Sequence, residues 1–405
     1  MFLVRGPLRS SAGYANDFAS PYVASRLWLQ QQNAYDSTRF LSTWQAAGAP
    51  SGDVYANPSS YHCIYPPTTI AILAPLATLS WPVAWAGMQV LSCLLYGIAA
   101  LRLAKLTQQG TGSRQVVGLI VFALIFAPVH SGLHVSNIVV LTAALLLWSS
   151  SELLLSPATT SLMPALGLGL ALSLKPSLVP LVLLWLLATR RWRPLLVAAA
   201  LPLAAFGVFL LRQSGQPWLH SLLTNQHFLF GYGSGSISAT NLTRYDRIDL
   251  QLPIYILTQQ RQLAVGLAYL AAAALVVLVL ATWLRAQPLH RTLDNDLLLL
   301  SCLLAIGLIP YYQRYYSACI LLLPAVWVVR NHTCIRARVL LACSPLFLLN
   351  TSIISRVISD APTPHPYLLG RLSDTLLNAH VCWLILLIAC TLTWQLRDSL
   401  RAARA

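Results

Sequence analysis

The strongest constraint on this chain is its series of long apolar segments, because about 20 apolar residues in a helix match the hydrocarbon thickness of a bilayer. Shorter spans are accepted where helices tilt or are buried among neighbours. Charged residues make up only 9% of the sequence, too few to cover a water-facing surface. We therefore predict an all-α polytopic membrane protein, a single domain over residues 1–405. Its eleven candidate spans are 82–101, 116–130, 134–150, 162–175, 177–189, 194–211, 262–284, 297–310, 317–329, 339–356 and 378–396.

The basic residues favour one orientation of these spans, since cytoplasmic loops carry the excess of Lys and Arg. With the C-terminus inside, 14 of the 26 basic residues fall in the inner loops 102–115, 190–193, 285–296, 330–338 and 397–405. The opposite segments 1–66, 212–261 and 357–377 hold seven of the 11 acidic residues. We expect these three segments to be extracytoplasmic loops of a protein in the inner (plasma) membrane.

This orientation leaves residues 1–66 outside with no span before them. The first four residues are too few for a signal peptide or a spanning helix. An odd number of spans with an external N-terminus would account for the arrangement. The interpretation that we favour is a missing first helix, lost to a late start site.

Several functional classes find no support in the sequence. The net charge of +15 is spread over short clusters between apolar runs, without the long basic run of a nucleic-acid binder. The eight cysteines show no CxxC spacing, and His130 and His134 lack a third ligand, so we expect no metal site. Nucleotide-binding and serine-hydrolase motifs are absent.

The charged residues expected on the outside are few, and ionisable groups near a bilayer are costly enough to mark functional positions. Asp17 precedes an amphipathic stretch, in which a helix over 22–32 places Leu27 and Trp28 near one face, along the membrane interface. The structural alternative for Asp17 is an N-cap of this helix.

Three more polar positions lie where short apolar segments begin or meet. Tyr65-Pro66-Pro67 opens the segment 68–79, which is too short to span, with proline tolerated in its first turn. Lys175-Pro176 separates two short spans, and Arg314 lies among four tyrosines between two others. Lys175 is either a snorkelling charge at an interface or a partner for an anion. An aromatic belt accounts for the tyrosines around Arg314 more readily than for Arg314 itself.

Together these motifs resemble the GT-C glycosyltransferases, and within them the polyprenyl-phosphate-mannose-dependent mannosyltransferases of glycosyltransferase family 87. The resemblance runs from about residue 16 to the C-terminus and thins after 260. The family's first spanning helix has no counterpart here, and the element at His134 lacks the family's Gln. The motifs that carry it are Asp17-Phe18, Asn33-Ala34-Tyr35-Asp36, Tyr65-Pro66-Pro67, His134-Val135-Ser136-Asn137, Leu174-Lys175-Pro176 and Arg190–Arg193.

The resemblance implies a GT-C-like bundle of about 11 transmembrane helices that moves a sugar, mannose in the family, from a polyprenyl-phosphate donor. The acceptor would be an extracytoplasmic glycolipid or polysaccharide. In this scheme Asp17 is the general base of an inverting transfer. The outward cations that would bind the donor phosphate are Lys175, Arg314, Arg247 and Arg244. Of these, Lys175 and Arg314 are favoured because each lies where two short spans meet. Site-shaping roles fall to Asp36, Tyr65, Pro66, His134 and Asn137. No metal or other cofactor is indicated, although some GT-C relatives use a divalent ion.

Two other functions stay open at this point. A transporter or lipid flippase would place ionisable residues in mid-membrane, often within paired halves. A non-catalytic scaffold would leave Asp17, Lys175 and Arg314 scattered, not converging on one cavity.

The predicted orientation can be tested with epitope tags. Antibody should reach a tag at the N-terminus in intact spheroplasts, and a tag at the C-terminus only after the membrane is permeabilised, because the Arg-rich loops hold the C-terminus inside. An N-terminal tag that is protected until permeabilisation would contradict the orientation.

Overall fold

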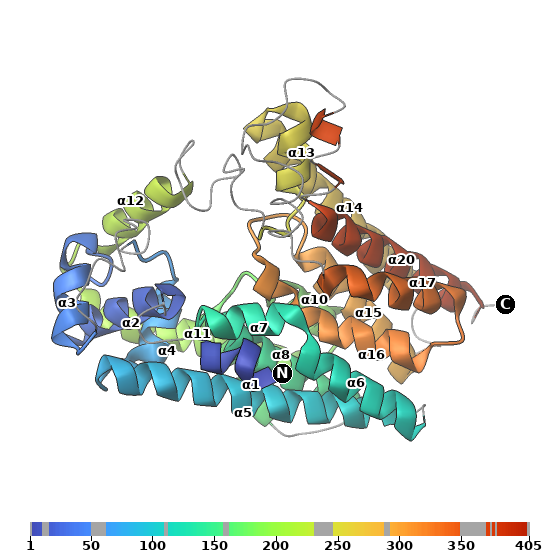
Figure 1. Cartoon of the computed structure of the whole chain (residues 1–405), viewed down its shortest axis with the longest axis horizontal. Helices are drawn as coiled ribbons and strands as arrows, with labels where there is room; N and C mark the ends of the chain where they lie inside the picture. The colour runs from blue at the N-terminus through green and yellow to red at the C-terminus, as the bar shows by residue number, and fades with distance from the viewer. Residues whose placement is uncertain are drawn as a thin grey trace.

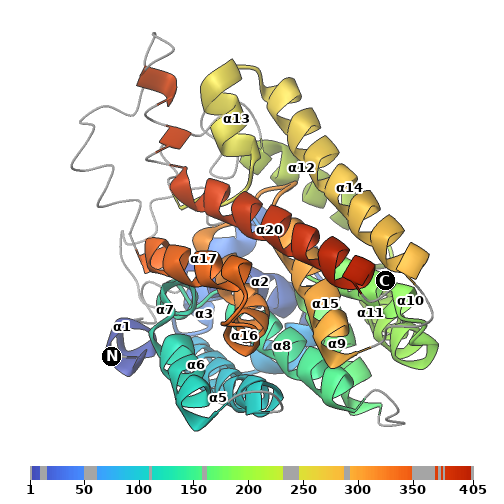
Figure 2. The same ribbon diagram turned by 90° about the vertical axis from the view of Figure 1, so that its right-hand side faces the viewer.

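The named elements of the computed structural model are all helices within the residues that it describes, and its long helices form a bundle (Figures 1 and 2). The described residues are 2–9, 16–49, 62–108, 112–156, 162–230, 246–286, 292–348, 370–372, 375–376 and 379–402. In the first half of the chain the elements are α1 (Phe2–Arg5), η1 (Pro7–Arg9), α2 (Asn16–Leu29), η2 (Ser37–Arg39), α3 (Phe40–Ala46), α4 (Pro67–Ala77), α5 (Trp81–Gln108), α6 (Ser113–Ile125), α7 (Ala127–His134), α8 (Val139–Leu155), α9 (Met163–Leu174) and α10 (Pro180–Ala188). They continue with α11 (Trp192–Gln213), α12 (Trp218–Phe230), α13 (Gln251–Thr258), α14 (Arg261–Ala286), α15 (Leu293–Gly307), η5 (Tyr315–Leu321), α16 (Leu322–Arg330), α17 (Ile335–Cys343), η6 (Ser344–Leu348) and α20 (His380–Ala402).

Five stretches among the described residues are long and apolar enough to cross a membrane on their own. They are α5, the combined α6–α7 segment, α11, α14 and α20. The described parts of the remaining candidate spans are mostly helical in shorter pieces, and several are enclosed by other helices. Residues 349–356 of the span 339–356 lie outside the described residues. In α15 every residue from Asp296 to Ile306 is buried, and α8 packs between α5 and α9. A helix that is apolar all round is stable when other helices cover it. The predicted fold class, an all-α polytopic membrane protein, is thus confirmed.

The structure departs from the predicted spans between residues 125 and 139. The helix breaks at Phe126, which has an extended backbone, and α7 restarts with Pro128 in its first turn. Proline lacks the N–H that a continuous helix would need here. Ser136 then adopts a left-handed conformation (φ 51°), so that α8 begins only at Val139. The polar turn between α7 and α8 is therefore longer than expected, and it carries Asn137.

The amphipathic segment forms α2, but its apolar face is covered by protein. Leu27 and Trp28 are buried, and α2 packs along α4. The indole Nε1 of Trp28 donates a hydrogen bond to the backbone oxygen of Phe209 on α11 at 3.1 Å. We had expected this face to lie along the membrane interface; instead it attaches α2 to α4 and α11, on one side of the bundle (Figure 1).

Two glycines let α9 approach its neighbours closely. A Cβ on Gly167 would lie 2.8 Å from Cζ3 of Trp148 on α8, and one on Gly169 would lie 2.9 Å from Cβ of Leu201 on α11. Small residues at such contacts are typical of membrane bundles, where close backbone packing drives association. A Cβ added at Gly207 on α11, by contrast, would meet no atom within 4 Å.

We predict that Gly169→Val lowers the free energy of unfolding by about 1–3 kcal/mol, because the added side chain overpacks the contact between α9 and α11. Thermal unfolding of the detergent-solubilised protein should show a lower Tm. Gly207→Val is the matched control, since it adds the same side chain on an uncrowded helix face. Equal Tm values for the two variants would contradict this packing.

Candidate active site

A cluster of charged and aromatic side chains forms where four distant segments meet. The start of α2 supplies Asp17, the turn between α7 and α8 supplies Asn137, the link between α9 and α10 supplies Lys175, and the start of η5 supplies Arg314 and Tyr316. The Asp17 carboxylate is 23% exposed, and its Oδ2 lies 3.4 Å from Nη1 of Arg314. The cluster is therefore partly open to solvent, and it contains an ionisable carboxylate beside a cation.

Asn137 fixes the orientation of the Asp17 carboxylate. Its Oδ1 accepts a hydrogen bond from the backbone N–H of Val139 at 2.8 Å, which leaves the amide nitrogen to act as a donor. That nitrogen donates to Oδ2 of Asp17 and to the hydroxyl of Tyr316, both at 2.9 Å. The Asp17 side chain thus reaches across to a partner 120 residues away.

The turn that presents Asn137 depends on Gly132. The backbone N–H of Asn137 donates to the backbone oxygen of Gly132 at 2.9 Å. A Cβ on Gly132 would lie 2.5 Å from a methyl group of Val140 and 3.3 Å from Cβ of Tyr316. Glycine is therefore required for α7 to pack this closely against both α8 and η5.

Arg314 is held by a second carboxylate and by backbone pairing. Its Nε donates to Oδ2 of Asp246 at 2.6 Å. Arg314 and Arg247 form an isolated antiparallel bridge, and the backbone N–H of Tyr315 donates to the oxygen of Asp246 at 2.7 Å. Since a guanidinium offers several donors in a fixed plane, these contacts set the direction in which Arg314 points.

Lys175 approaches the same tyrosine ring as Arg314. Nζ of Lys175 and Cζ of Arg314 each lie 5.1 Å from the centroid of the Tyr316 ring, within the range of cation–π attraction. Lys175 lies outside both flanking helices and is half-buried. Partial burial lowers the pKa of Lys175 to about 8, while the negative charge of Asp17 opposes this shift. The structure shows no ion pair between Lys175 and a described carboxylate.

Tyr65 and Pro66 lie at the edge of the cluster. Pro66 is the N-cap of α4, and Pro67 lies in the first turn, as the sequence predicts. The hydroxyl of Tyr65 donates to the backbone oxygen of Asp17 at 3.3 Å, and the hydroxyl of Tyr35 donates to the backbone oxygen of Tyr65 at 2.8 Å. These two tyrosines support the start of α2, where the Asp17 carboxylate is presented.

Other residues singled out in the sequence lie differently. His134 ends α7, three residues before Asn137. Asp36 caps η2, where it accepts hydrogen bonds from Thr38 and lies 3.4 Å from Nε of Arg39. Its contacts are local, and they do not join it to Asp17. Arg244 lies outside the described residues.

Arg247 is enclosed by protein and has a different environment from Arg314. Its side chain and that of Asp249 are both 0% exposed, with Nη2 of Arg247 2.6 Å from Oδ1 of Asp249. The backbone N–H of Gln313 donates to the same carboxylate at 3.3 Å. A buried, paired guanidinium of this kind is a structural tie, so we no longer count Arg247 among the phosphate ligands.

Two members of the cluster were not predicted, namely Tyr316 and Asp246. The tyrosines around Arg314 fit an aromatic belt at the membrane surface, so the sequence alone gave no reason to single out one ring. Asp246 entered only as one of the outer acidic residues. The sequence Asp246-Arg247-Ile248-Asp249 matches no known motif, so it does not show which of these charged residues belongs to the site.

A metal site has no candidate among the described residues, in which no three His, Cys, Asp or Glu side chains come together. The expectation of a metal-independent enzyme remains a prediction. The cations near Tyr316 are Lys175 and Arg314, and their side chains can bind an anion.

Comparison with known proteins identifies one match. No curated protein and no solved structure matches the chain. The sequence model of glycosyltransferase family 87 matches residues 63–310, more than half of the chain. The matched region includes Asn137 and Lys175 but ends before Arg314 and begins after Asp17. On this match, the chain belongs to glycosyltransferase family 87 and is a membrane glycosyltransferase.

Proposed function

We propose that the protein transfers a sugar, by family resemblance mannose, from a polyprenyl-phosphate donor to an extracytoplasmic glycolipid or polysaccharide. The observation that supports this proposal is the meeting of Asp17, Lys175 and Arg314 around the Tyr316 ring. A scaffold would not need this convergence. Membership of a glycosyltransferase family also favours the enzyme over a transporter or flippase. Placement in the inner membrane, with the site facing outward, completes the proposal.

Asp17 is the proposed general base. Both of its side-chain contacts with described residues end on Oδ2, so that Oδ1 remains for the hydroxyl of the acceptor. The carboxylate takes the proton as the acceptor oxygen attacks the anomeric carbon. In the same displacement the bond between that carbon and the phosphate oxygen breaks, and the configuration inverts. The electron pair of the broken bond leaves with the polyprenyl phosphate.

Charge balance explains why two cations belong in this site. Asp17 and Asp246 carry two negative charges, and Lys175 and Arg314 carry two positive charges. When Asp17 takes the proton, the cluster gains one positive charge, while the departing phosphate gains one negative charge. Fixed cations beside a developing anion stabilise the transition state more than the ground state.

The base can be tested by Asp17→Asn, which keeps the shape of the side chain but removes its basicity. Transfer from a polyprenyl-phosphate sugar should fall about a hundredfold or more, the usual range for loss of a general base. Asp398→Asn is the matched control, because Asp398 pairs with Arg336 near the C-terminus and shows no contact with the Asp17 cluster among the described residues. Activity is measured in membranes with equal protein abundance. Full activity of Asp17→Asn would remove Asp17 from the mechanism.

The lowered pKa of Lys175 predicts that sugar transfer depends on pH. Since its pKa in the free enzyme is about 8, it is charged below that pH and loses its charge as the pH rises further. We expect kcat/KM for the anionic donor to fall above pH 8, by up to about tenfold per pH unit where the charge is essential. Lys175→Arg should keep its charge and abolish this fall. An identical pH profile for the two proteins would argue against Lys175 as a phosphate ligand.

A further inference from the structure

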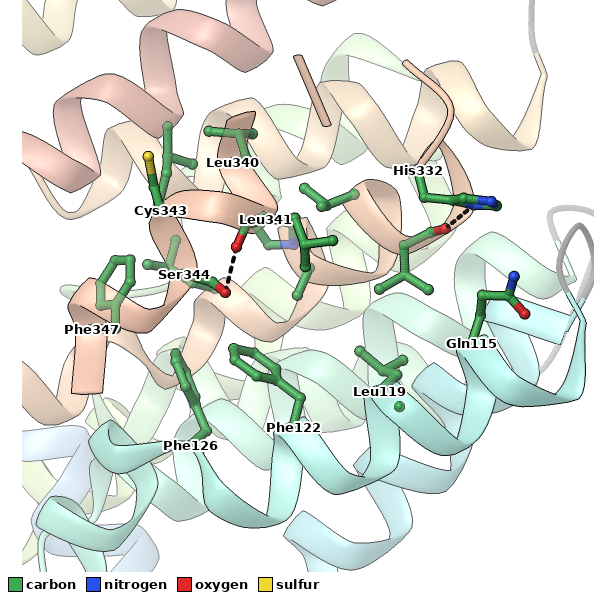
Figure 3. Close-up of a pocket in the computed structure, with 17 residues that line it drawn as sticks. Gln115, Leu119, Phe122, Phe126, His332, Leu340, Leu341, Cys343, Ser344 and Phe347 are labelled. Carbon is green, nitrogen blue, oxygen red and sulfur yellow. Dashed lines mark hydrogen bonds between the residues drawn. The ribbon is translucent and has the colours of Figure 1, made fainter. Parts of the chain in front are cut away.

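A cavity of about 480 Å³ lies between α6, α16, α17 and η6. Figure 3 shows Gln115, Leu119 and Phe122 along α6, with Phe126 directly after its end, on one side, facing residues of α17 and η6 on the other. From Gln115 to Phe126 the α6 wall extends for about 16 Å, at 1.5 Å per residue. Both the volume and the elongated form suit a narrow ligand, and the volume lies within the usual range of roughly 300–1,000 Å³ for ligand pockets.

The described lining of this cavity is almost entirely apolar. Leucine, valine and phenylalanine side chains cover most of its length, while Gln115 and His332 lie together at the end opposite Phe126 and Phe347 (Figure 3). Gly118 also lines it, and a Cβ added there would meet no atom within 4 Å. Ser344 also lines it, but its hydroxyl already donates to the backbone oxygen of Leu341 at 2.8 Å. Such a wall favours a hydrocarbon chain over a sugar or peptide.

The cavity is connected to the candidate active site through η5. The hydroxyl of Tyr315 donates to the backbone oxygen of Phe347, a lining residue at the cavity's aromatic end. Tyr315 stands directly between Arg314 and Tyr316 in the sequence, and Leu321 at the other end of η5 lines the cavity. The short helix η5 therefore begins beside the two cations, Arg314 and Lys175, and ends at the apolar wall of the cavity.

We propose that this cavity, the chain groove, holds the isoprene units of the donor lipid, while the phosphate attached to them lies at Lys175 and Arg314. This inference rests on the proposed function, since it specifies where that function's lipid-linked donor is bound. The direction agrees with the proposed orientation. Gln115 and His332 lie within the predicted inner loops 102–115 and 330–338, so the lipid chain would run inward from the outer cluster.

The contact through η5 favours a lipid with its anionic head at the cluster over a phospholipid with its head at the other end of the cavity. Phe347, which accepts the hydrogen bond of Tyr315, lies at the aromatic end, so this end adjoins the segment that carries Arg314. Lys175 is half-buried and shows no ion pair with a carboxylate in the described parts of the chain. At the other end, Arg330 and Arg336 are paired with Asp294 at 2.7 Å and Asp398 at 2.6 Å, and Arg114, beside Gln115, is exposed, so that solvent and salt screen its charge.

Photocrosslinking of a long-chain polyprenyl phosphate tests this site without sugar transfer. The probe carries a diazirine on an isoprene unit close to the phosphate, and it is irradiated with the full-length protein in nanodiscs. We expect labelled peptides from 113–126 and 335–347. In Gly118→Phe the yield should fall about tenfold or more, because the new ring occupies the groove and excludes the chain.

Gly207→Phe is the matched control, because it adds the same ring to a helix face with no atom within 4 Å. Labelling of this variant should equal that of the unmodified protein. Gly118→Leu adds a smaller side chain, so its labelling should fall by an intermediate factor. A Tm equal to that of the unmodified protein shows that each variant folds. Undiminished labelling in Gly118→Phe would overturn the proposal. So would labelling of the groove by a diazirine phospholipid that excess polyprenyl phosphate fails to displace.

Failure of the groove and failure of the proposed function are distinguishable. A protein that transfers sugar from a polyprenyl-phosphate donor but is labelled elsewhere retains its function and loses this binding site. A protein that is labelled in the groove but transfers no sugar from such donors keeps the lipid site and loses the proposed reaction.

Discussion

The hydrogen bonds of the Asn137 amide hold the candidate active site together. They join the start of α2 to the start of η5 through Asp17 and Tyr316. A carboxylate near a membrane is costly unless its charge is met by donors or cations. Asn137 and Arg314 supply these to one oxygen of Asp17. The start of α2 and the short helix η5 therefore have a common reason to pack at one place.

The arginine in this cluster depends on a second, fully buried interaction. Arg247 and Asp249 neutralise each other inside the protein, and the same carboxylate accepts a hydrogen bond from the backbone of Gln313. This tie holds two segments antiparallel, so that Asp246 meets Arg314. Removing one partner of a buried ion pair leaves an uncompensated charge, and this is strongly destabilising. The support of the site is thus more sensitive to substitution than its solvent-facing edge.

The sequence predicted the helical membrane fold because apolar length and the scarcity of charge are local properties. It also singled out Asp17, Asn137, Lys175 and Arg314, chiefly through the family resemblance. It favoured Arg314 over Arg247, because Arg314 lies where two short spans meet. Only the tertiary structure shows that Arg247 is enclosed and paired with Asp249. The Tyr316 ring was missed for the same reason: its partners lie at distances along the chain that no local pattern records.

The separation between Asp17 and Arg314 has a consequence for biosynthesis. These residues are 297 positions apart in the chain. A protein inserted from its N-terminus presents its carboxylate early and acquires the matching guanidinium only after most helices have entered the bilayer. A nascent polypeptide that has not yet reached Arg314 therefore lacks a complete reaction centre, and competence for group transfer arises only late in translation.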